Sequence, residues 1–392
     1  DDILKLENYQ GAESQYHGNL GEMIVTDLNN NNTSSLAWVE AAKEYGLPAN
    51  SDFNGETTFG VGSYQFSSTG RMRFSSATAF LKPAVKRGNV KVITNALVSK
   101  ILFNGNKAIG VEWIENNQVK KSYINKEVIL SSGSLQSPQI LQLSGIGPAK
   151  LLKKYDIPVV FDSPEVGENL QDHYQVRGIV KLKDNRGSVN NESRNPIKLA
   201  EWGLRWLLFG SGPLTCGAGQ VGGAACSKFA KNGRPDLQFN VMPLSVDKPG
   251  EPLHDYPGFT ASVWQCHPKS RGSLRIKSID PKEQVEIRPE YLSEKLDRDV
   301  IVEGIKMIRD IFKQPSFKDL WDTEMLPGEN IETNHEILDW AKNNGGTVFH
   351  AVGTCRMGND EKSVVDEKLK VRGVDNLRVI DASVMPQVTS AN

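Results

Sequence analysis

Residues 126–145 read KEVILSSGSLQSPQILQLSG, a short apolar strand that passes through small residues into a helix. Ser137 and Pro138 are typical of the first positions of a helix, and Gly145 is typical of its end. A strand, a small-residue turn and a helix start together present backbone N–H groups to a phosphate or another anion. An ordinary strand-to-helix connection has the same pattern, so this stretch alone leaves both interpretations open.

The segments on either side of this unit indicate strands. Residues 90–103 (VKVITNALVSKILF) and 108–115 (AIGVEWIE) are separated from each other and from residue 126 onward by Asn-rich turns, which predicts a β-meander. Residues 173–290 are rich in strand and turn residues and include the alternating stretches RGSLRIKS and QVEIRPEY. They predict an antiparallel sheet that is distinct from the strand–helix unit.

Two helices and one further strand are also predicted. Residues 34–46 begin with Ser and end with Gly, as a capped helix does. Residues 297–313 carry Ile301, Ile305, Ile308 and Phe312 at helical spacing, which we interpret as core packing. Near the end of the chain, LRVIDASVMP (377–386) reads as a strand. Asp381 follows this strand, where open α/β sheets bind ligands.

Composition excludes several classes of protein. The 392 residues include 46 Lys and Arg and 47 Asp and Glu, so there is no broad attraction to nucleic acid or to an acidic surface, and a small, nearly neutral partner fits better. The four cysteines are widely spaced without a C-x-x-C pair, which argues against a zinc knot or a disulfide framework. No apolar run is long enough for a transmembrane segment.

The ends of the chain say little about its location. Residue 1 is an Asp in a helix-like segment, and the given residues show no signal-peptide pattern, so we expect a cytoplasmic protein unless a targeting signal lies upstream. The sequons at Asn32 and Asn191 are weak evidence of secretion, because so short a pattern arises by chance.

The histidines are the main candidates for chemistry. His350 lies in HAVGTCRMG, a run of small residues suited to a crowded pocket, whereas we interpret the other five as structural residues. No G-x-S-x-G, P-loop, H-E-x-x-H or other paired-His metal spacing is present, so serine hydrolases, phosphate-loop enzymes and zinc proteases lack their usual support, and we expect no metal.

Several blocks, taken together and in order, resemble the glucose-methanol-choline (GMC) oxidoreductases over essentially the whole chain. They are SSATAFLKPA (75–84), NALVSKILF (95–103), GSLQSPQILQLSGIG (133–147), VGENLQDH (166–173), PKSRGSLRI (268–276), FHAVGTCRMG (349–358) and VVDEKLKVRGVDNLRVIDASVMP (364–386). Asn392 matches a second catalytic position, which is His in some members, and so resembles the choline-dehydrogenase-like and hydroxymethylfurfural-oxidase-like branch.

This resemblance implies an FAD enzyme that removes hydride from the carbon of a primary alcohol, with oxygen or another compound as electron acceptor. His350 matches the catalytic base or acid, since an alkoxide expels hydride more readily than an alcohol. An amide at Asn392 would position the substrate hydroxyl. The cofactor-binding positions carried over are Val98, Ser131, Ser132, Gly133, Asp381 and Ala382.

The family's G-x-G-x-x-G segment and the helix after the catalytic Asn are absent from this sequence, so we expect a fragment whose parent is the enzyme, and FAD binding by the isolated chain stays open. The fold class implied is α/β (α+β overall), an incomplete Rossmann-like FAD domain interleaved with a substrate domain on an antiparallel sheet. The expected division is a substrate-side and lid region at 1–80, FAD-domain parts at 81–172 and 345–392, and the substrate domain at 173–344.

Two other functions stay open at this point. The resemblance extends to family members that cleave cyanohydrins without net oxidation, and the missing nucleotide segment favours a non-catalytic fragment or binding protein. The substrate is also open, because Trp202, Trp206 and Leu207 suit an apolar or aromatic alcohol but equally suit a core. Choline would need an aromatic cage or a carboxylate, and neither is apparent in the sequence. The sequence does not indicate an oligomeric state.

Overall fold

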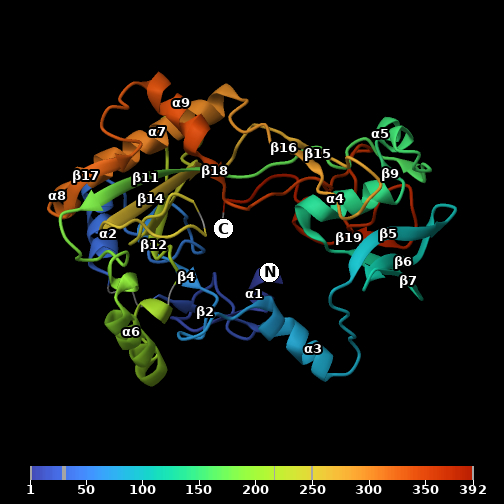
Figure 1. Cartoon of the computed structure of the whole chain (residues 1–392), viewed down its shortest axis with the longest axis horizontal. Helices are drawn as coiled ribbons and strands as arrows, with labels where there is room; N and C mark the ends of the chain where they lie inside the picture. Colours follow the sequence, from blue (N-terminus) through green and yellow to red (C-terminus); the bar gives the residue numbers. More distant parts are fainter. Residues whose placement is uncertain (1, 29–31, 216, 249, 391–392) are drawn as a thin grey trace.

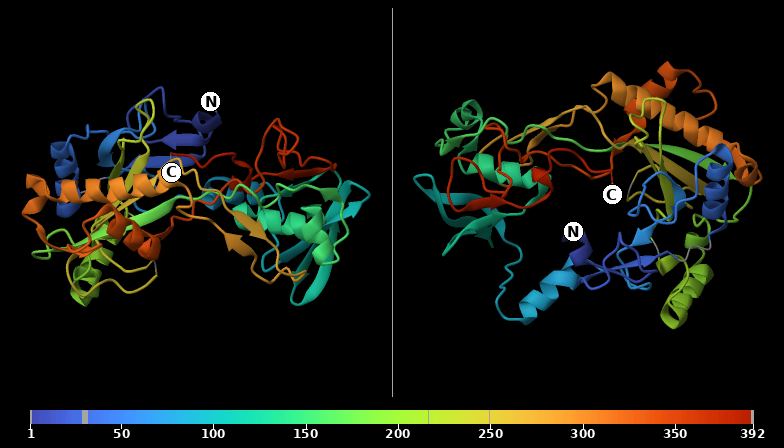
Figure 2. Two further views of the ribbon diagram at one scale, coloured as in Figure 1. Left: turned by 90° about the horizontal axis from the view of Figure 1, so that it is seen from above. Right: turned by 180° about the vertical axis from the view of Figure 1, so that it is seen from behind.

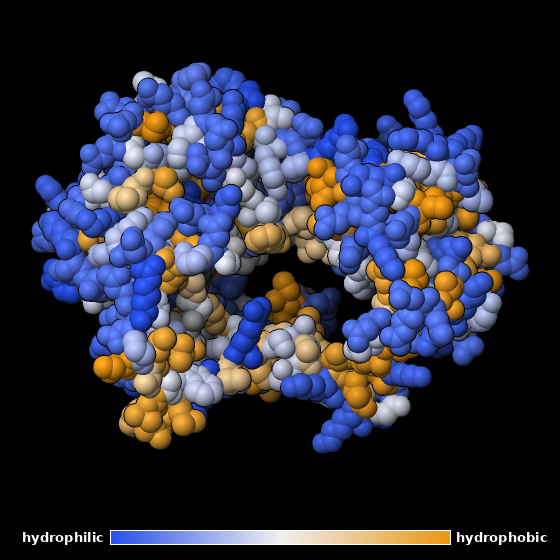
Figure 3. All heavy atoms as spheres, viewed as in Figure 1, coloured by the Kyte–Doolittle hydropathy of each residue, from blue (hydrophilic) through white to orange (hydrophobic). Residues whose placement is uncertain are grey.

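The computed structural model describes residues 2–28, 32–215, 217–248 and 250–390, which form two lobes joined by extended segments (Figure 1). Seen from above, the lobes lie at opposite ends of an elongated molecule (Figure 2). An opening passes between them (Figure 3). None of the described helices is long and apolar enough to cross a membrane.

The first lobe is built on a six-stranded antiparallel sheet, as residues 173–290 predict. Its strands are β11 (Tyr174–Leu182), β12 (Val221–Ala225), β13 (Leu237–Met242), β14 (Gly258–Gln265), β17 (Trp321–Leu326) and β18 (Gly346–Thr347). The order is β12-β13-β14-β11-β17, and β18 pairs with the start of β11. Because side chains alternate along each strand, one face buries its apolar side chains under helices and the other carries polar ones.

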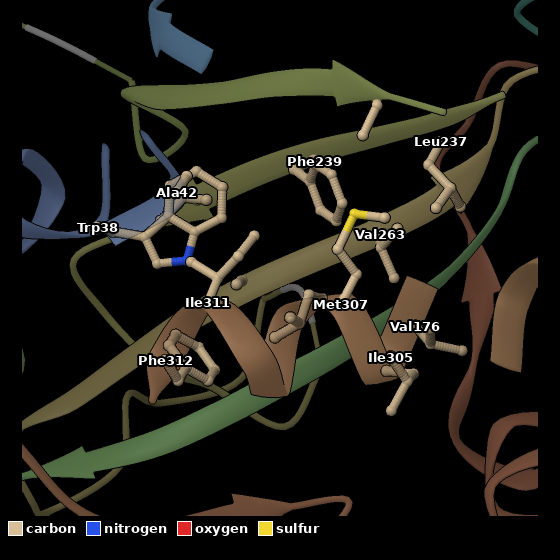
Figure 4. Packing of buried hydrophobic residues seen from close by; sticks show 14 of the residues in the cluster. Trp38, Ala42, Val176, Leu237, Phe239, Val263, Ile305, Met307, Ile311 and Phe312 are labelled. Atoms are coloured by element: carbon tan, nitrogen blue, oxygen red, sulfur yellow. The ribbon is translucent and has the colours of Figure 1, made fainter. Parts of the chain in front are cut away.

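Helix α7 (Lys295–Phe312) covers the apolar face of this sheet, and the stripe predicted on residues 297–313 is buried in the interface. Figure 4 shows Ile305, Met307 and Ile311 of α7 among side chains of the sheet strands and of α2. Burying each such side chain contributes roughly 1.5–3 kcal/mol. This cluster is the larger of two separate cores.

Helix α2 (Thr33–Tyr45) confirms the helix predicted at 34–46, but its N-cap is Asn32 and not a serine. The Asn32 side chain accepts a hydrogen bond from the backbone N–H of Ser35 at 3.0 Å, and Gly46, at φ 116°, closes the helix. The remaining helices of this lobe are η2 (Glu192–Arg194), α6 (Pro196–Phe209), η3 (Pro213–Thr215), α8 (Pro315–Lys318) and α9 (Asn334–Asn344).

The N-terminal region forms short elements that lead from the first lobe toward the second. They are α1 (Asp2–Leu6), β1 (Glu7–Tyr9), β2 (Met23–Asp27), β3 (Gly60–Ser63), β4 (Gln65–Phe66), the π-helix η1 (Ala77–Leu81) and α3 (Lys82–Lys86). Strand β1 pairs parallel with β2, which pairs antiparallel with β4.

The second lobe contains a three-stranded meander, whose first two strands were predicted and whose third, at residues 118–123, was not, and a separate parallel strand pair. Its elements are β5 (Leu97–Asn104), β6 (Lys107–Glu115), β7 (Gln118–Tyr123), β8 (Val128–Leu130), α4 (Gly133–Leu143), β9 (Ile146–Gly147), α5 (Ala149–Lys154), β10 (Phe161–Asp162), β15 (Ser273–Arg275), β16 (Glu286–Arg288), β19 (Leu377–Val379) and η4 (Ala382–Val384). Strands β8 and β19 pair in parallel although they are far apart in sequence.

Helix α4 begins at Gly133, so the start predicted at Ser137-Pro138 was wrong by four residues. Pro138 lies inside the helix and cannot donate to the carbonyl of Ser134. The Thr354 hydroxyl donates to that carbonyl instead, at 2.6 Å. A side chain from the far end of the chain therefore lets the helix pass through a proline that would otherwise mark its start.

Candidate active site

Strand pairing brings two histidines together between the lobes. His173 directly precedes β11, and His350 lies three residues after β18, whose Thr347 is the register partner of Tyr174. The Nδ1 atoms of the two imidazoles are 3.0 Å apart, and the rings meet edge to face. His173 is fully buried and His350 is half-buried. His173, predicted from the sequence to be a structural residue, is thus hydrogen-bonded directly to His350.

Asp172 holds the backbone of both histidines. One carboxylate oxygen accepts hydrogen bonds from the backbone N–H groups of His173 and His350, each at 2.9 Å. The other oxygen accepts from the hydroxyl groups of Tyr291 and Thr347. Four donors fix this buried carboxylate, so it holds the backbone of the histidine pair rigidly.

The hydrogen bonds also assign the protons. Nε2 of His173 lies 3.1 Å from the backbone carbonyl of Cys266, which can only accept, so Nε2 carries a proton. Burial lowers the pKa of His173 to about 4, so the ring is neutral at pH 7 and its Nδ1 accepts. Nδ1 of His350 must then donate, which leaves the proton of a neutral His350 on Nδ1 and the lone pair on Nε2.

His350 is poised to accept a proton. Burial lowers the pKa of His350 below its ordinary value of 6.5, although the nearby charge of Asp172 acts in the opposite direction. In the part of the chain that the structure describes, no group hydrogen-bonds Nε2 of His350. The arrangement therefore offers one unprotonated imidazole nitrogen near neutral pH.

Trp264 and Phe349 shape the surroundings of His350. The Trp264 ring, on β14, lies edge-on 6.3 Å from the His350 ring and 6.1 Å from that of His173. Phe349 has a φ of 65°, unusual for a bulky residue, and its side chain is 77% exposed. This backbone turn directs Phe349 outward and its neighbour His350 toward the other histidine.

The predicted cofactor residues, apart from Val98, gather at the carboxyl ends of β8 and β19. Asp381 accepts hydrogen bonds from the Gly133 N–H at 3.0 Å, the Ser137 hydroxyl at 2.5 Å and the Ser383 N–H at 2.8 Å. It therefore joins β19 to the start of α4. Ser131, Ser132 and Ala382 flank this junction.

Val98 and Asn392 stand apart from this group. Val98 lies on β5 opposite Trp113 of β6, half-buried against the second core. Asn392 lies outside the described residues.

The segment 350–355 links the histidine pair to this junction. The Ser134 hydroxyl donates to the Ala351 carbonyl at 2.5 Å, and the Cys355 N–H donates to the Ser383 carbonyl at 2.9 Å. One short stretch thus ties His350 to both α4 and η4, so the two predicted halves of the site share one framework.

The junction has features that fit part of a dinucleotide. The N-cap residue Ser132 makes no side-chain cap hydrogen bond to α4, and the Asp381 carboxylate already accepts from the Gly133 N–H, so an anion is held at this helix start. Gly133 has a φ of 84° with open space where a Cβ atom would stand, and Ser131 is exposed. No cluster of His, Cys, Asp and Glu suited to a metal ion occurs among the described residues.

Trp202, Trp206 and Leu207 lie on α6 and make no contact with the histidine pair in the described structure. Trp202 is buried, Trp206 donates its indole N–H to the Arg71 carbonyl, and Leu207 is exposed. Sequence reasoning missed Trp264, His173 and Asp172. The last two stand in VGENLQDH (166–173), which could have signalled them, whereas no pattern marks Trp264.

Comparison with known proteins gives consistent matches. Two family models, both described as GMC oxidoreductase, match residues 3–175 and 268–392. The alcohol dehydrogenase [acceptor] of Pseudomonas putida is 39% identical over 99% of this chain and 70% of its own length. The oxygen-dependent choline dehydrogenase of Citrobacter koseri is 36% identical over 99% of this chain and 70% of its own length.

Solved structures share the fold. An FAD-dependent oxidoreductase from Chaetomium thermophilum superposes with a TM-score of 0.88 and 25% identity, covering all of this chain and 76% of that one. The formate oxidase of Aspergillus oryzae gives a TM-score of 0.90 at 23% identity, over all of this chain and 74% of that one.

Proposed function

The chain belongs to the GMC oxidoreductase family, and from this premise we propose that it oxidises primary alcohols with FAD, His350 acting as the base. The observation that carries the role of His350 is the hydrogen bond between its Nδ1 and Nδ1 of His173. This bond leaves Nε2 as the nitrogen that can accept the proton of a substrate hydroxyl. FAD, when bound, supplies the acceptor for the hydride.

The chain's own residues prepare the proton transfer. His173 fixes the tautomer of His350, and Asp172 fixes its backbone and favours the imidazolium that forms. Trp264 excludes water from one side of the pair. We further propose that Asn392 hydrogen-bonds the substrate hydroxyl and orients it, as an amide can without taking the proton.

We propose that Ser131, Ser132, Gly133, Asp381 and Ala382 hold FAD at the first turn of α4. The open space at Gly133 and the exposure of Ser131 support this role. Asp381 would act mainly by fixing the turn, because both of its carboxylate oxygens already accept hydrogen bonds. For Val98 we propose a backbone contact at the edge of the site.

The charges near the histidine pair favour an uncharged alcohol over choline. Arg177 lies on β11, four residues from His173 and on the same face of the sheet, and burial lowers its pKa without an opposing carboxylate. No acidic residue stands on this face of β11 to β14, whose side chains come from Gln175, Arg177, Ile179, Lys181, Gln238, Asn240, Met242, Thr260, Ser262 and Trp264. Asp172, the carboxylate beside the pair, already accepts four hydrogen bonds, so a quaternary ammonium group would meet the Arg177 cation and no carboxylate free to face it.

The test is anaerobic bleaching of the flavin absorbance in FAD-loaded protein by a panel of primary alcohols. We expect bleaching by the parent protein and its loss, by at least about a hundredfold in rate, in His350→Gln. His335→Gln, which changes an exposed histidine, is the matched control. Bleaching that survives His350→Gln would remove the base from the proposal.

Two other outcomes would overturn the activity itself. Cleavage of a cyanohydrin without bleaching would identify a lyase. Failure to take up FAD even when the missing nucleotide-binding segment is restored would leave a binding or structural protein. The three results are distinguished by absorbance and by cyanide release in the same samples.

A further inference from the structure

Helix α6 extends from the outer edge of the first lobe, at the lower left of Figure 1. One side is anchored, because Trp202 is buried and the Trp206 indole donates to the Arg71 carbonyl at 3.1 Å. The opposite side is apolar and faces solvent. Its residues are Ile197, Leu204, Leu207 and Leu208, and Leu214 of η3 is exposed as well.

Several of these side chains lie close together on α6. Ile197, Leu204 and Leu208 are seven and four residues apart, which places them on one stripe of the helix, and Glu201, paired with Lys198 at 2.9 Å, lies on the same stripe. Ile197 is 77% exposed, Leu204 56% and Leu208 58%. Figure 3 shows an orange protrusion at the lower left, where Figure 1 places α6. Single exposed leucines are ordinary, but a group of exposed apolar side chains around one salt-bridged carboxylate on a protruding helix indicates a surface that something covers.

The flanks of the patch are cationic. Lys198 and Arg205 lie on α6 itself, and Arg71 and Arg73 lie on the adjoining turn. Arg71 donates to the Leu207 carbonyl at 3.3 Å, which holds this turn against α6. The sole acidic residue of segments 69–74 and 195–214 is Glu201, which pairs with Lys198 at 2.9 Å. These segments carry a net charge of +3, whereas the whole chain carries −1.

The charges around α6 indicate which kind of partner covers its apolar face. A symmetric pair of chains that met through α6 would bring two such cationic flanks together, which opposes association. An apolar row bordered by Lys, Arg and Trp on a convex helix is instead typical of helices that lie in the plane of a membrane surface. We propose that α6 docks this chain on a bilayer that contains anionic phospholipid. Its leucines enter the boundary between headgroups and acyl chains while Arg71, Arg73 and Arg205 meet the phosphates. This inference is independent of the proposed alcohol oxidation.

The experiment is sedimentation of the full chain with vesicles of phosphatidylcholine, alone or mixed with phosphatidylglycerol. We expect binding to the mixed vesicles that weakens as salt is raised. The variant Leu204→Gln/Leu208→Gln should bind at least about tenfold more weakly, because its apolar burial is lost. The variant Arg71→Gln/Arg205→Gln should lose about fivefold for each charge.

A matched control carries Val119→Gln and Tyr123→Gln, which change equally exposed apolar residues on β7 in the other lobe. We expect this control to bind like the parent, and thermal melts to show all variants folded, since every altered side chain is exposed. Absence of binding to mixed vesicles would overturn the proposal. Equal, salt-insensitive binding to both vesicle types, or a dimer that the leucine variant abolishes, would do the same.

Discussion

His173 accepts a hydrogen bond from Nδ1 of His350, so Nε2 is the nitrogen of His350 that remains for a substrate. A leucine at position 173 would remove this acceptor and let His350 adopt either tautomer. We expect His173→Leu to lower kcat/KM on the order of a hundredfold. His173→Asn, whose amide oxygen can still accept, should recover much of this loss. Equal losses in both variants would indicate that His173 acts by packing alone.

The pH profile separates positioning from packing. Since a base must be unprotonated, and burial lowers the pKa of His350, kcat/KM should rise with pH and level off below 6.5. In His173→Leu, the imidazolium of His350 loses its hydrogen-bond acceptor and gains an apolar neighbour, so we expect the rise to move further below 6.5. A profile that keeps its position would contradict the assigned role.

Stability should also depend on His173. The folded state lowers the pKa of this residue from 6.5 to about 4, so between these values the unfolded chain binds more protons than the folded one. Stability is therefore fully present above pH 6.5 and is lost as the pH falls toward 4, by about 3 kcal/mol in total. Urea unfolding at pH 7 and pH 4.5 should show a smaller acid loss, by about 2 kcal/mol, in His173→Gln. His335→Gln should keep the slope of the parent.

Arg177 provides the test of substrate charge. We expect choline to be oxidised with a kcat/KM at least about tenfold below that of its neutral isostere, in which carbon replaces the quaternary nitrogen. Arg177→Glu should narrow or reverse this ratio, because it places a carboxylate on the same face of the sheet. Arg177→Gln is the control for loss of the cation without gain of an anion. Parent protein that prefers choline would contradict the charge argument.

The sequence indicated some residues of the candidate site and not others. His350 stood out because small residues surround it, and Asp381 because it follows a strand. His173 did not, since its role arises from the pairing of β18 with β11 across more than 170 intervening residues. The proton assignment needs the Cys266 carbonyl, whose position depends on a third strand. Such contacts are properties of the fold, and no local pattern encodes them.

At the level of elements, α4 depends on a hydroxyl group from elsewhere in the chain. Thr354 replaces the hydrogen bond that Pro138 cannot make to the buried carbonyl of Ser134. We expect Thr354→Val to lower the free energy of unfolding by about 1–3 kcal/mol, since that carbonyl loses its partner. Thr354→Ser keeps the hydroxyl and should cost less. Pro138→Ala restores an N–H donor, so it should rescue Thr354→Val, and additive losses in the double variant would contradict this account.

The same helix shows where element prediction fails. Ser137-Pro138 has the local signature of a helix start, yet tertiary contacts of Thr354 and Asp381 extend the helix back to Gly133. By contrast, α7 was predicted with its buried stripe, because eighteen residues of regular periodicity outweigh any one contact. The parallel pairing of β8 with β19 was not predicted, because the sequence of a strand does not indicate which other strand it pairs with.

For the whole molecule, the two cores bear on the proposed domains. The first core draws on residues 38–61, 176–263 and 292–341, and the second on 101–166 and 355–384. The proposed boundaries near residues 172 and 345 fall between these sets. We therefore propose that 81–172 and 345–392 form one folding unit, against which β15 and β16 pack, and that the rest of 173–344 forms the body of the other.

Two separate cores joined by extended segments should unfold separately. We expect calorimetry to resolve two transitions. Ile305→Ala, in the first core, should lower the midpoint of one, and Leu141→Ala, in the second, that of the other, each with a loss of about 2–5 kcal/mol in its own unit. The two substitutions are matched, because each truncates a fully buried aliphatic side chain. A single transition that both variants shift would contradict the proposed division. It would mean that the two lobes unfold as one cooperative unit, coupled by the segment 350–355, which bonds to α4 and η4.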